Sequence, residues 1–131
     1  MNAADVARHI ETTFEGIDRT EAYGYTMFFY GTLRMLPFAT LLEHDTEYDN
    51  VSNLDARGAY RLNIGVEKAT YRALELADDQ TALDCLLPHP HYSAQSWVSI
   101  ISPSDATFAE TLVPLLAEAY ALAKRRDQRL D

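Results

Sequence analysis

The stretch Ala59-Tyr60-Arg61-Leu62-Asn63-Ile64-Gly65-Val66 alternates between apolar and polar residues over most of its length. Alternation with a period of two is typical of a β-strand, because successive side chains of a strand point to opposite faces of the sheet. The pattern therefore predicts a strand with one apolar face, which carries Leu62 and Ile64. Arg61, Asn63 and Gly65 lie on the other face.

Three further strands are expected around this one. Residues 25–30 and 37–43 are rich in Tyr, Phe, Met and Thr, which suit a half-buried pleated surface. The six residues from Gly31 to Leu36 have a length suited to a hairpin loop between these two strands. Residues 96–102 form the last predicted strand. Residues 44–58 are polar and predict a loop, with a short turn near Asn53-Leu54-Asp55.

The N-terminal segment is predicted to be a helix of about three turns. Asn2 is a suitable cap, Asp5 falls in the first turn, and Val6 and Ile10 belong to an apolar stripe at four-residue spacing. Gly16 follows as a natural end to the helix.

Residues 67–77 also have helical spacing, with Tyr71 and Leu74 on the buried side. Residues 82–87 predict a short helical turn before two prolines that require extended backbone. For the last helix, Ser102 is the expected cap and Pro103 the expected first residue. Pro114 removes a backbone donor inside that helix, so we expect a kink or a restart there.

The resulting order α-β-β-β-α-β-α predicts an α+β fold in which an antiparallel sheet of about four strands has helices packed on one face. No repeat, low-complexity tract or linker interrupts the chain, so residues 1–131 are expected to form a single domain.

Four segments occur in a fixed order along the second half of the chain: Leu62-Asn63-Ile64-Gly65-Val66, Pro88-His89-Pro90-His91-Tyr92, Trp97-Val98, and Leu115-Leu116 through Tyr120 and Leu122. In this order they resemble the MmcQ/YjbR-like superfamily with its CyaY-like fold, and in particular an uncharacterised branch of single-domain proteins of unknown function. The resemblance implies the same α+β fold. MmcQ/YjbR-like proteins are often described as DNA-binding, so it also implies an alternative function in nucleic-acid binding.

The charge balance argues against a nucleic-acid partner. The chain has 11 basic and 20 acidic residues, a formal net charge of −9, which repels phosphate backbones and anionic lipid headgroups. The main basic cluster, Lys124-Arg125-Arg126 with Arg129, ends the last helix, where cations complement the negative end of the helix dipole.

The composition also indicates the cellular compartment of the protein. A single cysteine, Cys85, cannot form an internal disulfide, and its apolar neighbours are expected to keep the thiol inert. No segment approaches the roughly 20 consecutive apolar residues that cross a bilayer. These observations predict a cytoplasmic protein without a membrane partner.

The first candidate site is a ligand cleft on the polar face of the strand at residues 59–66. Arg61 and Asn63 lie on that face, and Trp97 and Ser99 share one alternation on the last strand. Together with three aromatic or imidazole side chains they would line an open cleft. Alternatively, Trp97 is a core residue and Arg61 pairs with an acid such as Asp55. The three additional side chains are Tyr30, His89 and Tyr92.

The second candidate is a metal site at the histidine loop. His89 and His91 are two residues apart in extended backbone, so both can face one metal ion. His44 is the expected third ligand, with Glu43, Asp45 and Cys85 as alternatives. In the opposing interpretation, one histidine hydrogen-bonds the backbone of a proline-stiffened loop and the other is solvated.

Residues 43–49 contain four carboxylates and an imidazole, a composition that suits either a hard cation or a solvated hairpin end. Their spacing lacks the glycine of a calcium loop.

Neither a nucleophile motif nor a phosphate-binding glycine loop is present in the sequence, which predicts no enzymatic activity and no cofactor. We therefore expect a non-enzymatic module that binds a protein partner or a small molecule, with a homodimer as a further possibility. A nucleic-acid-binding protein and a metal-binding protein are the alternatives.

Overall fold

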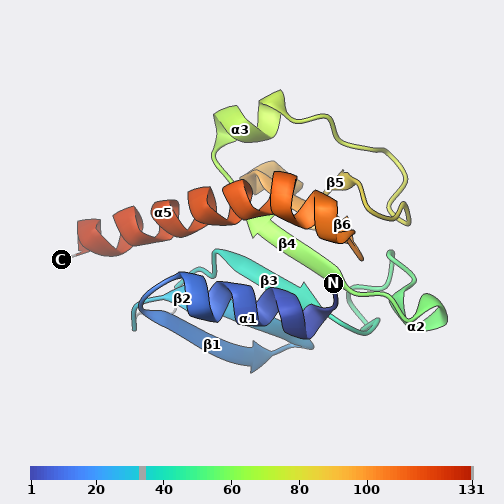
Figure 1. Ribbon diagram of the computed structural model, residues 1–131, viewed down its shortest axis with the longest axis horizontal. Helices are drawn as coiled ribbons and strands as arrows, with labels where there is room; N and C mark the ends of the chain where they lie inside the picture. Colours follow the sequence, from blue (N-terminus) through green and yellow to red (C-terminus); the bar gives the residue numbers. More distant parts are fainter. Residues whose placement is uncertain (33–34, 131) are drawn as a thin grey trace.

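The computed structural model describes residues 1–32 and 35–130, which fold into one mixed unit of helices and strands (Figure 1). Residues 33 and 34 of the predicted hairpin loop lie outside the described residues. The main helices are α1 (Ala3–Thr13), α2 (Leu54–Arg57), α3 (Lys68–Ala73), α4 (Asp105–Thr107) and α5 (Val113–Leu130). A short 3-10 turn, η1 (Ser93–Gln95), and a π-helical segment, η2 (Phe108–Leu112), complete the helical elements.

The described strands form one antiparallel sheet in the order β1-β2-β3-β4-β6-β5. The sheet has six strands rather than the predicted four, so the α+β class is confirmed while the number of strands was wrong. The strands are β1 (Ile17–Ala22), β2 (Tyr25–Tyr30), β3 (Ala39–Leu42), β4 (Arg61–Gly65), β5 (Leu86–Pro88) and β6 (Trp97–Ile101).

The two strands that were not predicted are the edges of the sheet. β1 has polar or charged residues at four of its six positions, so it lacks the apolar alternation of a half-buried strand. β5 is only three residues long and ends at Pro88. It replaces the helical turn that was predicted for residues 82–87.

Helix α1 begins as predicted. The Asn2 side chain accepts a hydrogen bond from the backbone N–H of Asp5, and the Asp5 carboxylate accepts one from the backbone N–H of Asn2. This reciprocal capping box satisfies two N–H groups that a helix start leaves free. Val6 and Ile10 are fully buried against the sheet.

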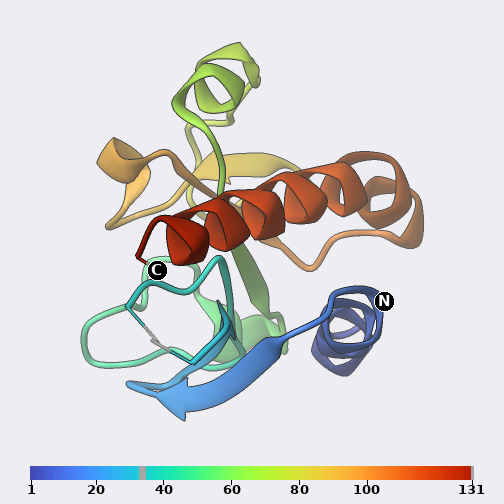
Figure 2. The ribbon, with the colours of Figure 1, turned by 90° about the vertical axis from the view of Figure 1, so that its left-hand side faces the viewer.

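Helices α1 and α5 cover the same face of the sheet (Figures 1 and 2). The main hydrophobic core lies between them and the strands, which agrees with the predicted packing for these two helices. The short helix α2 differs, because Leu54 packs against the opposite face of the sheet. The alternation in β4 is confirmed, since Leu62 and Ile64 point into this core. The largest fully buried side chains of the main core include Ile10, Phe28, Phe38, Leu62, Ile64, Ile100 and Leu112.

The start of the C-terminal helical region differs from the prediction. Ser104 rather than Ser102 is the cap: its hydroxyl accepts a hydrogen bond from the backbone N–H of Thr107. Ser102 instead has a positive φ of 44°, outside the helix. The expected irregularity before Pro114 is present as the π-helical segment η2, in which the Val113 N–H reaches back to the Phe108 carbonyl.

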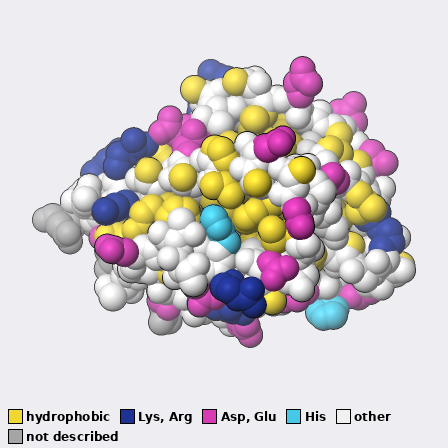
Figure 3. Space-filling view, in the orientation of Figure 1, with side chains coloured by type: hydrophobic (Ala, Val, Ile, Leu, Met, Phe, Trp, Pro, Cys, Tyr) yellow, Lys and Arg dark blue, Asp and Glu magenta, His cyan; other side chains and the backbone are white. Residues whose placement is uncertain are grey.

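One helical stretch, Asp105–Arg129, is long and apolar enough to meet the length and composition criteria for crossing a membrane, contrary to the expectation from the sequence. The core helix of a soluble protein meets the same criteria. Phe108, Leu112, Leu116 and Ala119 on this stretch are buried in the main core. Figure 3 shows hydrophobic side chains gathered over α5, with charged side chains around them.

The opposite face of the sheet has a smaller apolar cluster near α2. Its members are Leu42, Leu54, Ala59, Leu87 and Ile101. The polar residues beside this cluster form the site described below.

Gly65 of β4 and Trp97 of β6 are cross-strand neighbours, and the indole lies over the glycine. A Cβ at position 65 would lie 2.8 Å from Cε2 of Trp97, closer than the two atoms can approach. We expect Gly65→Ala to displace the indole, with a loss of about 1–3 kcal/mol in the free energy of unfolding. Because Trp97 is the single tryptophan of the chain, its emission maximum reports the displacement directly.

Gly58→Ala is the matched control. Gly58 has a φ of +58° and nothing within 4 Å of the Cβ position, so alanine there strains only the backbone. It should lower stability without moving the Trp97 emission. An unchanged emission maximum in Gly65→Ala would contradict the close contact.

Candidate functional site

A row of buried polar side chains crosses the sheet on the face opposite α1. Asn63 of β4 lies between Thr40 of β3 and Ser99 of β6, its direct cross-strand partners. The Asn63 amide donates to Thr40 Oγ1 at 3.0 Å, and its carbonyl accepts from Ser99 Oγ at 2.6 Å. All three side chains are buried. Arg61 adds a fourth member, because its Nε donates to Asn63 Oδ1 at 2.8 Å.

Arg61 is completely buried and forms a bidentate ion pair with Asp49. Its two terminal nitrogens lie 2.8 and 2.5 Å from the two carboxylate oxygens of Asp49, and Nη1 also donates to Ser52 Oγ at 2.9 Å. The Tyr25 hydroxyl donates to the same carboxylate. The guanidinium and the carboxylate are thus both paired away from water, as buried charges require.

These contacts fix the protonation states. Burial acts to raise the pKa of Asp49, but hydrogen bonds from Arg61 and Tyr25 and the charge of Arg61 outweigh it, so this pKa is below its ordinary value. Burial and the neighbouring Asp49 carboxylate raise the pKa of Tyr25 well above its usual value. At neutral pH, Asp49 is therefore ionised and Tyr25 is a neutral hydroxyl donor.

The segment that carries Asp49 is held over the sheet by its own hydrogen bonds. The Asp49 N–H donates to Thr46 Oγ1 at 2.9 Å, and the Thr46 N–H donates to the Asp49 carbonyl at 2.9 Å. Asp45 accepts hydrogen bonds from the N–H groups of Leu54 and Asp55, the first two residues of α2. The loop between β3 and α2 is thus an ordered cover for the polar row.

His89 follows β5 and has only 2% of its surface exposed. Its Nδ1 accepts hydrogen bonds from the backbone N–H groups of His91 at 3.0 Å and Tyr92 at 3.1 Å. An atom that accepts two hydrogen bonds cannot also hold a proton, so the proton of the neutral ring is on Nε2. Burial, followed by the charge of Arg61, lowers the pKa of His89 to about 3.

Thr40, Asp49 and His89 border a cavity of about 960 Å³ on the second face of the sheet, the face opposite α1. Aromatic rings dominate the lining, and Trp97 lies edge-on to His89 with ring centres 6.1 Å apart. Tyr23 and Tyr48, which are 88% and 82% exposed, stand at its rim. The lining comprises Tyr23, Tyr25, Met27, Leu36, Pro37, Thr40, Thr46, Tyr48, Asp49, His89, His91, Tyr92, Gln95, Trp97 and Arg126.

Arg126 and His91 bring polar groups to the same cavity from different elements. Arg126 belongs to the last turns of α5, whose C-terminal end extends toward the link between β2 and β3, where Gly31 lies against Asp127 (Figure 2). His91 Nε2 lies 4.0 Å from Asp49 Oδ2, beyond hydrogen-bonding distance.

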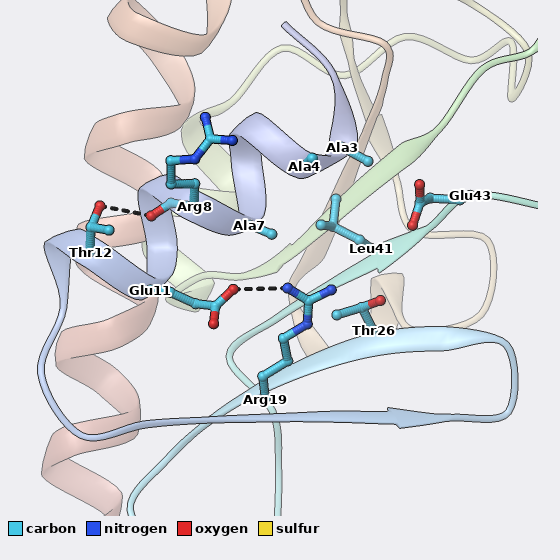
Figure 4. A pocket seen from close by; sticks show the side chains of 10 residues that line it. All are labelled: Ala3, Ala4, Ala7, Arg8, Glu11, Thr12, Arg19, Thr26, Leu41 and Glu43. Carbon is cyan, nitrogen blue, oxygen red and sulfur yellow. Dashed lines mark hydrogen bonds and ion pairs between the residues drawn. The ribbon is translucent and has the colours of Figure 1, made fainter.

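A second hollow of about 430 Å³ lies between α1 and strands β1 to β3 (Figure 4). Small side chains of α1 and an ion pair line it: Arg19 Nη1 lies 2.9 Å from Glu11 Oε1. These two charges satisfy each other, and the described part of this hollow offers no buried unpaired polar group.

The structure brings all five predicted ligand-binding residues to the second face of the sheet. His89, Tyr92 and Trp97 line the cavity, whereas Arg61 and Asn63 lie buried beneath it rather than on an open surface. Arg61 pairs with Asp49 and not with Asp55. Tyr30, which was also expected in the cleft, packs edge-on against Tyr120 of α5 on the other face.

The predicted metal ligands are not brought together. Within residues 1–32 and 35–130, no group of three or more His, Cys, Asp or Glu side chains is arranged to hold a metal ion. His44 is exposed and pairs with Asp55 at 3.0 Å, and His89 Nδ1 is occupied by backbone donors. The opposing interpretation, with one histidine bonded to the backbone and the other partly solvated, describes His89 and His91.

The carboxylates at residues 43–49 form no group of three or more metal-ligating side chains with any of the described residues. Asp45 and Asp49 are used in hydrogen bonds to α2 and to Arg61. Cys85 packs beside the small apolar cluster, as its neighbours in the sequence indicated.

The sequence prediction missed Asp49, Tyr25 and Arg126 as parts of the site. Tyr25 and Met27 point to the same face of β2, and Met27 is the cross-strand partner of Thr40. The pairing of β2 with β3 could therefore have placed Tyr25 on the second face of the sheet. Asp49 and Arg126 gave no comparable signal, because one lies in a polar loop and the other in a basic helix end.

The chain belongs to a family of unknown function, DUF6194, whose family model matches residues 1–131. That description does not mention MmcQ/YjbR-like proteins. The search of curated proteins found no match, and neither did the search of solved structures.

The buried neutral state of His89 predicts a pH dependence of stability. The folded pKa of about 3 is below the ordinary value of 6.5, so the unfolded chain takes up a proton that the native state excludes as the pH falls below 6.5. Stability should therefore decline between pH 6.5 and 4.5, by about 2 kcal/mol from this residue alone. Urea titrations at several pH values measure the decline.

His89→Asn is the informative variant, because the asparagine carbonyl can replace Nδ1 as an acceptor and does not titrate. Its stability should vary less with pH than that of the wild type over the same range, while His44→Asn, at an exposed histidine, should keep the wild-type slope. A midpoint near 6.5 for His89 in NMR titration would contradict the buried neutral state from which this pH dependence is predicted.

Proposed function

We propose that this protein is a non-enzymatic binding protein that takes a small, largely apolar molecule in the cavity on the second face of its sheet. The observation that carries the proposal is the Nε2–H of His89. It belongs to a side chain that is 2% exposed and lines the cavity, and it makes no hydrogen bond to any residue that the structure describes. A ligand acceptor would satisfy it.

The form of the cavity supports this proposal. Small-molecule sites are concave, mostly apolar and built with few fixed polar groups, and about 960 Å³ is at the upper end of their usual volume. The polar row beneath the cavity is internally satisfied, so Asn63, Thr40 and Ser99 make a rigid floor. Two backbone N–H groups donate to Nδ1 of His89 and hold the imidazole ring in place, so its Nε2–H keeps its orientation without a ligand.

Binding rather than catalysis is favoured by the state of the titratable groups. Asp49 is engaged by Arg61 and Tyr25, so its carboxylate is not free to act as a base. His89 has its basic nitrogen occupied and a pKa far below neutral, so it is a poor proton acceptor at pH 7.

The nucleic-acid alternative, which the MmcQ/YjbR-like resemblance implies, has weaker support. Arg125 of the basic cluster forms an ion pair with Glu67 at 2.6 Å, and its neighbour Arg126 lines the cavity. The two cations therefore lie in different environments and do not form one basic surface. The net charge of −9 also opposes binding to a phosphate backbone. We infer a cytoplasmic location from the same composition, and a homodimer remains an outcome of the experiment below.

Native mass spectrometry of untagged protein, followed by titration of Trp97 fluorescence with any released compound, tests the proposed function. We expect a bound mass of small-molecule size, and quenching or a shift of the Trp97 emission on rebinding. His89→Asn should weaken rebinding about tenfold because it removes a buried hydrogen bond to the ligand. His44→Asn, at a histidine outside the cavity lining, should bind like the wild type.

Two results would contradict the proposed function. One is a bare monomer or dimer together with no change of Trp97 emission across a broad compound library. The other is ligand binding that is unaffected when His89 is replaced.

A further inference from the structure

We propose that the ligand is a planar aromatic acid, whose ring lies among the cavity aromatics, whose acceptor group meets Nε2 of His89, and whose carboxylate meets Arg126. This inference rests on the proposed function and gives the chemical class of its ligand. Three features of the cavity carry it: the shape of the walls, the position of the charges and the type of donor at the deep end.

The walls favour a flat ring. Trp97 is held over Gly65, and Tyr92 lies 5.0 Å from His89 between ring centres. Tyr25 is fixed by its hydrogen bond to Asp49, so its ring is also held in place. Aromatic side chains prefer stacked or edge-to-face partners, an interaction worth about 0.5–1.5 kcal/mol for each pair beyond the buried area.

The charges of the lining favour an anion, although the chain as a whole is acidic. Asp49 is the one carboxylate in the described lining, and Arg61 neutralises it from below. Arg126 forms no ion pair with any residue that the structure describes, whereas its neighbour Arg125 is paired with Glu67. The cavity therefore carries a local positive charge in a protein with a net charge of −9.

The depth of each group assigns the two ends of the ligand. Arg126 is exposed, so a carboxylate beside it keeps part of its hydration. His89 is buried and neutral, so the group that meets it is best uncharged, such as a carbonyl or a ring nitrogen. The two polar ends are separated by an aromatic body, as the tyrosine and tryptophan walls require.

Three related probes test this class: para-acetylbenzoate, para-acetylbenzamide and para-isopropenylbenzoate, titrated by NMR against isotope-labelled protein. The acetyl acid should bind most tightly. The amide lacks the charge and should bind about fivefold more weakly, as expected for the loss of a partly exposed ion pair. The isopropenyl acid lacks the acceptor and should lose about fivefold or more.

Variants connect each loss to its residue. Arg126→Gln should abolish the preference for acid over amide, and His89→Asn should abolish the preference for acetyl over isopropenyl. Arg125→Gln is the matched control for charge, since it removes a neighbouring cation that does not line the cavity, and it should preserve both preferences.

The outcomes separate this inference from the proposed function. Equal binding of acid and amide, or a preference for acid that survives Arg126→Gln, would overturn the proposed class while cavity binding stands. If none of the probes binds but an unrelated molecule copurifies, the class is also wrong and the proposed function is supported. If no probe binds, no molecule copurifies and no compound of the library changes the Trp97 emission, both are contradicted.

Discussion

The buried ion pair between Arg61 and Asp49 is the interaction on which the second face of this sheet depends. A guanidinium with no exposed surface is costly to bury unless it is paired and hydrogen-bonded, and here Asp49, Asn63 and Ser52 accept four hydrogen bonds from it. Because Asp49 belongs to the loop between β3 and α2, the pair also draws that loop across the sheet. The loop then contributes Thr46, Tyr48 and Asp49 to the cavity wall.

The same pair explains why the cavity has a polar floor without free charges. Removing one partner would leave the other buried and unpaired, so the two residues are required together. Tyr25 joins them from β2, and Asn63 connects them to β3 and β6. Four of the six strands thus meet one charge network through their side chains, and the position of the Tyr25 ring in the cavity wall follows from it.

Much of the fold could be predicted from local patterns. The alternation around Leu62 and Ile64, the Asn2 and Asp5 capping box and the irregularity near Pro114 each have a cause within a few residues. β1 and β5 could not be predicted in this way, because an edge strand needs no apolar alternation and a three-residue strand has no period. The helix cap was assigned to Ser102 rather than Ser104 because both serines flank Pro103 and only the backbone turn distinguishes them.

The site could be predicted only in part, for a physical reason. His89, Tyr92 and Trp97 lie on or beside strands whose alternation indicates a shared face. Arg61 was placed on the correct face but was expected to be accessible, since a sequence does not show that a loop twelve residues away covers it. The choice of Asp49 over Asp55 as its partner depends on the turn at Thr46, a tertiary contact without a sequence signature.

A double-mutant cycle on Arg61→Met and Asp49→Leu, followed by denaturant unfolding, tests this account most directly. Each single variant should lose about 3–5 kcal/mol, because a charge is left buried without its partner. The double variant should lose much less than the sum, with a coupling energy of about 2 kcal/mol or more. Additive losses would show that Arg61 and Asp49 act independently and would contradict the central role given to their ion pair.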